Sequence, residues 1–105
     1  MGTQARRSPR YSFYASAQIT ELRTGMPLTT RTSELSRHGC YFDMLTPLRL
    51  GTAVKVQVSN QGQTFEAKGR VIYIHPNMGM GVAFDEIEAG QELVIEKWLS
   101  DLRGT

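Results

Sequence analysis

Alternation of apolar side chains with a period of two residues is the feature that most limits how this chain can fold. It runs through residues 13–20, 54–58 and 65–73. Because successive side chains of a strand point to opposite faces, each segment predicts a strand with one buried face. The predicted inward positions are Phe13, Ala15, Ala17, Ile19, Val54, Val56, Val58, Phe65, Ala67, Gly69, Val71 and Tyr73.

Turn residues separate these segments and define further strands. Gly25 and Pro27 precede a threonine-rich stretch at residues 28–33, and residues 60–63 predict the turn of a hairpin. Short apolar stretches at residues 40–42 and 79–84 complete the set, and the glycines of the latter permit close backbone approach.

The period changes near the C-terminus. From about 89 to 102, one face of a predicted helix is apolar, and glutamates near its start suit the positive end of the helix dipole. In 105 residues this pattern predicts one mainly β domain: a six-stranded antiparallel barrel with a C-terminal helix over one end or side. Core positions expected on the helix are Val94, Ile95, Trp98, Leu99 and Leu102.

Composition excludes several classes of protein. With 40% hydrophobic and 21% charged residues the chain has a globular composition, and it has neither an apolar run of about 20 residues nor an apolar stretch behind its basic start. We therefore expect a cytoplasmic protein. Cys40, a core position, makes a poor metal set with His38 and His75, so no metal or cofactor is expected. No nucleophile and base can be paired, so an enzyme is not expected.

Three arginines, Arg6, Arg7 and Arg10, stand in the run RRSPR. Pro9 favours an extended or turned segment, in which Arg6 and Arg10 share a face with their Cα atoms about 13 Å apart. Guanidinium groups bind phosphate bidentately and stack on flat rings, so the cluster indicates a phosphorylated, ring-bearing ligand. A plain basic tail is the alternative that the cluster alone leaves open.

A second motif follows at Glu34, Ser36 and Gly39. Together, R-x-x-x-R at Arg6 and Arg10 and the element ending in S-x-x-G make the chain resemble the PilZ domain family. The resemblance extends through Gly51-Thr52, Gly69-x-Val71-x-Tyr73 and Gly81-Val82-Ala83-Phe84, and so covers nearly the whole chain.

This resemblance implies a six-stranded barrel that binds the bacterial second messenger cyclic di-GMP. Arg6 and Arg10 would then clamp its phosphates or a guanine edge, and Arg7 would add a contact or stack on a base. Ser36 supplies a hydroxyl, while Gly39 permits a turn or close ligand approach.

One position departs from the family pattern, which has Asp or Asn where this chain has Glu34. Glutamate keeps the carboxylate but adds a methylene, so we expect binding with reduced affinity. Further candidate ligand contacts are Arg37 and His38, for which a solvated loop is the alternative, and Tyr73, for which the barrel wall is the alternative.

The predicted organisation is a flexible clamping segment at residues 1–11 and a barrel domain at residues 12–105. Without an attached output domain, the receptor is expected to relay its signal to an effector protein as ligand orders the N-terminal segment. Two other interpretations remain: a degenerate PilZ interaction module that binds no nucleotide, and a barrel that binds single-stranded nucleic acid. The low net charge of +2 and the lack of obvious exposed aromatic residues disfavour the last.

Overall fold

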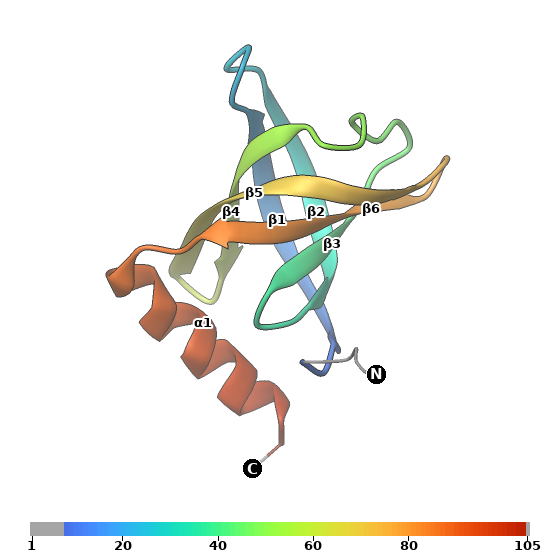
Figure 1. Ribbon diagram of the computed structural model, residues 1–105. Helices are drawn as coiled ribbons and strands as arrows, with labels where there is room; N and C mark the ends of the chain where they lie inside the picture. The colour runs from blue at the N-terminus through green and yellow to red at the C-terminus, as the bar shows by residue number, and fades with distance from the viewer. Residues whose placement is uncertain (1–7, 105) are drawn as a thin grey trace, which may run out of the picture.

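The computed structural model describes residues 8–104, which form six strands followed by one helix (Figure 1). The predicted mainly β barrel with a C-terminal helix is confirmed. The elements are β1 (Tyr11–Glu21), β2 (Pro27–Leu35), β3 (Gly39–Asp43), β4 (Ala53–Asn60), β5 (Gln63–His75), β6 (Gly79–Glu86) and α1 (Ala89–Leu102).

The six strands close into a barrel in the order β1-β2-β3-β6-β5-β4, and every neighbouring pair is antiparallel. Two of these pairings join strands that are not consecutive in the sequence, β1 with β4 and β3 with β6, and they complete the closed barrel. Closure gives each strand a partner on both sides, so none offers the unpaired edge at which open sheets aggregate.

The alternating side chains fill the barrel as predicted. Along β1, the residues Phe13, Ala15, Ala17 and Ile19 are buried, while the residues between them are exposed. The three valines of β4 are fully buried, and β5 contributes a similar set from Phe65 to Val71. The central β-branched residues pack well on the pleated surface of a barrel wall.

The two-residue period of β5 placed Tyr73 on the same face as Val71, with a ligand contact as the other interpretation, and the structure shows that Tyr73 does not share that face. Val71 pairs with Val82 and Tyr73 pairs with Gly81, which leaves Ile72 as an extra residue in a β-bulge. A bulge shifts the alternation by one residue. Ile74 therefore packs on the core, while Tyr73 lies against Gly81 on the outer side of the sheet.

Helix α1 lies across one end of the barrel (Figure 1). Its buried residues are Ile95, Trp98 and Leu99, and the Trp98 ring lies 5.3 Å from that of Phe13 and 6.3 Å from that of Phe65, measured between centroids. The helix thus supplies the side chains that cover the barrel core at this end. Val94 and Leu102, also predicted for this face, are partly buried against it.

Candidate functional site

A surface pocket of about 1000 Å³ lies beside the start of β1, between the β2–β3 hairpin and the bulged part of β5. Segments far apart in the sequence meet there only because the barrel closes. The lining residues are Ser8, Pro9, Arg10, Glu34, Leu35, Ser36, His38, Gly39, Cys40, Tyr41, Ile72, Tyr73, Gly81, Val82 and Ala83.

The β2–β3 hairpin forms one end of the pocket. It is tight: Ser36 N donates to the Gly39 carbonyl at 2.9 Å, and the Ser36 hydroxyl lies 3.3 Å from both that carbonyl and the His38 nitrogen. A Cβ atom on Gly39 would lie 2.3 Å from the carbonyl oxygen of Val82, so a side chain there would force the strands apart. The close approach of this hairpin to β6 therefore requires glycine at position 39.

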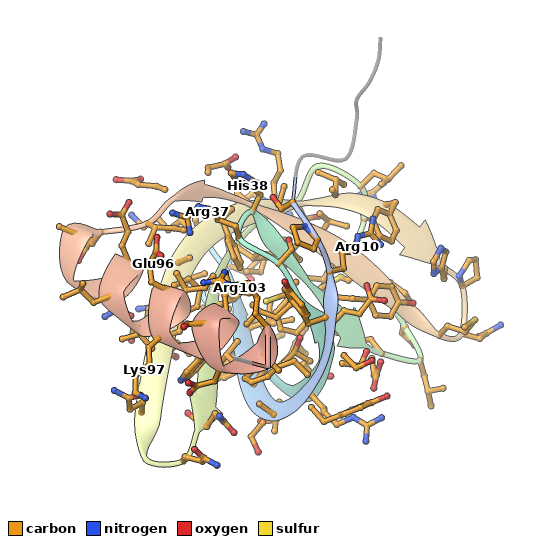
Figure 2. All side chains as sticks on the ribbon, turned by 90° about the horizontal axis from the view of Figure 1, so that it is seen from below. Arg10, Arg37, His38, Glu96, Lys97 and Arg103 are labelled. Carbon is orange, nitrogen blue, oxygen red and sulfur yellow. The ribbon has the colours of Figure 1, made fainter. Side chains whose placement is uncertain are left out.

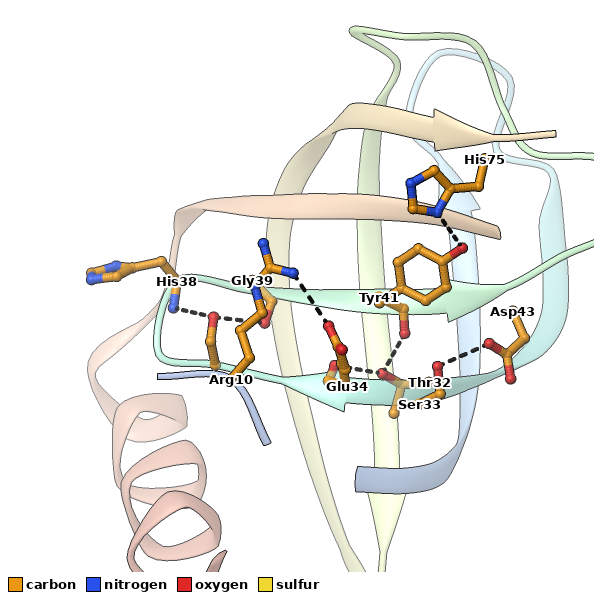
Figure 3. A network of polar contacts seen from close by, with 10 residues as sticks. Arg10, Thr32, Ser33, Glu34, His38, Gly39, Tyr41, Asp43 and His75 are labelled. Atoms are coloured by element: carbon orange, nitrogen blue, oxygen red, sulfur yellow. Dashed lines mark hydrogen bonds and ion pairs between the residues drawn. The ribbon is translucent and has the colours of Figure 1, made fainter. Parts of the chain in front are cut away.

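Arg10 and Glu34 lie opposite each other on this pocket. Arg10 Nη1 donates to Glu34 Oε1 at 3.5 Å, and both side chains remain substantially exposed (Figure 3). An exposed pair at this distance is worth about 0–1 kcal/mol, so an incoming anion can displace it at little cost. The two groups expected to touch a ligand thus lie within reach of each other before any ligand arrives.

An aromatic cluster of three residues lies at the pocket, and two of them, Tyr41 and Tyr73, line it. The ring centroids of Tyr41, Tyr73 and His75 lie 5.3–6.1 Å apart, and the Tyr41 hydroxyl is hydrogen-bonded to His75 Nδ1 at 3.0 Å (Figure 3). The Tyr73 ring rests on Gly81, where a Cβ atom would lie 2.4 Å from the ring. The pKa of Tyr41 is raised, mainly by burial and to a smaller extent by the neighbouring Tyr73, so its hydroxyl stays protonated at neutral pH. The cluster offers flat rings to a flat ligand.

Arg37 does not line the pocket. Its guanidinium forms an ion pair with Glu96 of α1 (Figure 2). The hydrogen bond from Arg37 holds the pKa of Glu96 below its ordinary value, and the same bond raises the pKa of Arg37. This arginine therefore connects the hairpin to the helix.

Cys40 lies at the floor of the pocket as a buried core residue, as predicted. Burial raises the pKa of its thiol to about 12, with a hydrogen bond to Thr32 acting in the opposite direction. The thiol is therefore neutral and unreactive at physiological pH.

The structure brings together most of the predicted site residues. Arg10, Glu34, Ser36 and Gly39 line one pocket, as do the further candidates His38 and Tyr73, whereas Arg37 contacts α1. Arg6 and Arg7 lie outside the described residues.

Sequence reasoning missed Tyr41 and Ile72, which also line the pocket. The signal for Tyr41 was present: it stands between two buried residues, Cys40 and Phe42, so alternation directs it outward. The same alternation directed Ile72 outward, between Val71 and Tyr73, but the sequence did not show that this outer face of β5 meets the β2–β3 hairpin.

Between residues 8 and 104 no cluster of three or more His, Cys, Asp or Glu side chains is arranged to hold a metal ion. Over the same residues, no helix has both the length and the apolar character needed to cross a bilayer.

Comparison with known proteins places these features in context. A family model described as PilZ domain matches residues 4–101. Comparison with curated proteins gives no match.

Three solved structures share the fold. The PilZ domain of YcgR from Escherichia coli, with c-di-GMP, has a TM-score of 0.76 at 21% identity, covering 95% of this chain and 92% of that one. The PilZ domain of CeSA from a cellulose-synthesizing bacterium has a TM-score of 0.72 at 19% identity, over 91% and 99%. MotI (DgrA), an inhibitor of motility from Bacillus subtilis, has a TM-score of 0.80 at 15% identity and 96% coverage of this chain, which spans only 52% of that protein.

Proposed function

Because the chain belongs to the PilZ domain family, we propose that it is a receptor for the bacterial second messenger cyclic di-GMP. It acts as a binding module and not as an enzyme. The observation that carries the proposal is that Arg10, from the start of the barrel, lines the same pocket as Glu34, Ser36 and Gly39. Support also comes from the PilZ domain of YcgR, which has this fold and was solved with c-di-GMP.

Each of these groups has a role that suits the ligand. Arg10, with Arg6 and Arg7, binds the phosphates or a guanine edge, because guanidinium forks form bidentate, charge-assisted hydrogen bonds. Glu34 accepts hydrogen bonds from the donor groups on the Watson–Crick edge of guanine. The Ser36 hydroxyl, already at the pocket surface, donates to phosphate or base. Tyr73 packs on a guanine ring and His38 lies at the rim.

Binding begins with exchange of partners at Arg10. A ligand phosphate carries a full charge into the pocket and competes with the carboxylate of Glu34 for the guanidinium. Once Arg10 turns to the phosphate, Glu34 is left for the guanine base. The exposed ion pair is weak enough for this exchange, and its loss lowers the net affinity by no more than about 1 kcal/mol.

The signal reaches an effector protein when ligand orders residues 1–11, which changes the surface that the barrel offers. Amide exchange by NMR tests this step: residues 4–11 gain protection when ligand is added. Equal protection in the free protein contradicts it. A cytoplasmic location in a bacterium is part of the same proposal.

Calorimetric titration with cyclic di-GMP, GMP and an oligonucleotide tests the binding function. The wild type binds the cyclic dinucleotide, and Arg6→Ala/Arg10→Ala loses that binding. The matched control is Arg23→Ala/Arg49→Ala, which removes the same charge from exposed sites that do not line the pocket. Equal loss in both double variants contradicts a specific clamp.

The alternative is a degenerate PilZ module that binds a protein and no nucleotide. The Arg10–Glu34 pair favours it, since each residue already has a partner in the free chain. Failure of the wild type to bind any of the three ligands supports this alternative.

A further inference from the structure

Thr32 of β2 is the one polar side chain that is fully buried in the described part of the chain. Its Oγ1 lies 2.8 Å from the carbonyl oxygen of Tyr41 and 3.1 Å from that of Glu34 (Figure 3). A threonine hydroxyl has a single hydrogen, so the two carbonyls share one donor, and the same hydroxyl also contacts the Cys40 thiol. This buried hydroxyl therefore connects the backbones of two residues that both line the pocket.

The strand is irregular at this point. Thr32 pairs with Phe42, but the next partners are Glu34 and Tyr41, so Ser33 is an extra residue in a β-bulge. Bulges change the direction of the side chains that follow them. Glu34 is the next residue, and its side chain is directed at Arg10. The Thr32 hydroxyl bonds to the carbonyls of the two residues that pair just beyond this bulge.

We propose that Thr32 is a positioning residue for nucleotide binding: its hydroxyl fixes the Glu34 carboxylate relative to the aromatic ring of Tyr41. Thr32 is not among the residues that line the pocket, so it acts through these two neighbours. The inference rests on the proposed binding of cyclic di-GMP. It adds a residue outside both sequence motifs.

The chain itself supplies a matched control. Thr30, two residues earlier on β2, also donates its hydroxyl to a carbonyl of β3, that of Asp43. Asp43 does not line the pocket. Thr30→Val and Thr32→Val therefore remove the same kind of contact between the same two strands, and only Thr32→Val removes it beneath the site.

The test compares Thr32→Val, Thr32→Ser and Thr30→Val by calorimetry with cyclic di-GMP and by thermal unfolding. We expect Thr32→Val to raise Kd by about tenfold, the size of one polar contact, while the other two stay within about threefold of wild type. Both valine variants lower Tm. An unchanged Kd in Thr32→Val, or an equal rise in Thr30→Val, overturns the proposal.

A second comparison tests the proposal even if Thr32→Val does not fold. Thr32→Cys and Thr32→Ser each keep one γ atom, but a thiol is a larger group and a weak donor, and both variants are measured under reducing conditions because Cys40 contacts this position. Weaker binding by Thr32→Cys than by Thr32→Ser supports the positioning role, and equal Kd values overturn it.

Amide exchange in the free protein separates this inference from the proposed function. Thr32→Val is expected to lower protection at Glu34 and Tyr41 relative to Thr30→Val, and equal protection overturns the inference. If wild type does not bind cyclic di-GMP, the proposed function fails, and the exchange result still decides whether Thr32 holds these two residues.

Discussion

Arg10 Nη1 lies 3.5 Å from Glu34 Oε1, so two residues that line the pocket from neighbouring segments, the start of β1 and the end of β2, form an ion pair in the free protein. Neither side chain is buried, and the pair contributes little to the stability of the fold. In the proposed binding of cyclic di-GMP, a phosphate of the ligand competes with Glu34 for the guanidinium.

Shortening this carboxylate is expected to favour the ligand. In Glu34→Asp the carboxylate moves away from Arg10 and regains the length usual in the family, so cyclic di-GMP should bind about three- to tenfold more tightly. Calorimetry measures the change. The control is Glu86→Asp at the exposed end of β6, which should leave Kd unchanged. Equal or weaker binding by Glu34→Asp refutes this account of the pair.

A side chain at Gly81 is predicted to displace the ring of Tyr73. A Cβ atom there would lie 2.4 Å from the ring of Tyr73, so Gly81→Ala should displace the ring and destabilise the barrel by about 1–3 kcal/mol. Gly90, at the start of α1, has no atom within 4 Å of such a Cβ, and Gly90→Ala should stabilise by up to about 1 kcal/mol. Urea unfolding measures the free energy of unfolding of both variants and of wild type. If Gly81→Ala is as stable as wild type, the Tyr73 ring moves aside without cost and the prediction is wrong.

The thiol of Cys40 should be inert in the folded protein. It is buried, and its pKa of about 12 leaves almost no thiolate at pH 8. An aromatic disulfide reagent should therefore react fully in guanidinium chloride and hardly at all in buffer. Rapid reaction in buffer would show that the floor of the pocket opens readily.

The ion pair between Arg37 and Glu96 should give stability a specific pH dependence. The hydrogen bond from Arg37 lowers the pKa of Glu96 in the folded state below its ordinary value of 4.5. A group of this kind stabilises the fold above the unfolded-state pKa, and the contribution disappears as pH falls through the folded-state pKa.

Glu96→Gln should therefore have a lower Tm than wild type at neutral pH, and the difference should shrink as the pH falls below 4.5. Thermal unfolding across this range measures it, with the exposed Glu86→Gln as the control. If the difference in Tm between Glu96→Gln and wild type does not change with pH, the ion pair with Arg37 is not its cause.

The architecture could be predicted from the sequence because the alternation of apolar and polar residues within a single strand shows which side chains face the barrel core. Alternation along β1 and β4, and the helical spacing of Trp98 with Ile95, needed no knowledge of partners. The site was harder to predict from the sequence. Tyr73 changes face because of a bulge that depends on pairing with β6, and Arg37 meets a residue 59 positions away on α1. Both depend on tertiary contacts that local spacing does not encode.

Closure of the barrel has a thermodynamic consequence for the site. The pocket walls come from the residues just before β1, from β2, β3, β5 and β6, and from the loop between β2 and β3, so an unfolded chain has no partial version of the site to offer. A ligand that binds only the closed form draws the folding equilibrium toward it, by about 2.7 kcal/mol at a concentration of 100 Kd. If the protein binds cyclic di-GMP as proposed, the concentration of this messenger sets how much of the chain escapes unfolding and proteolysis, as well as how much is occupied.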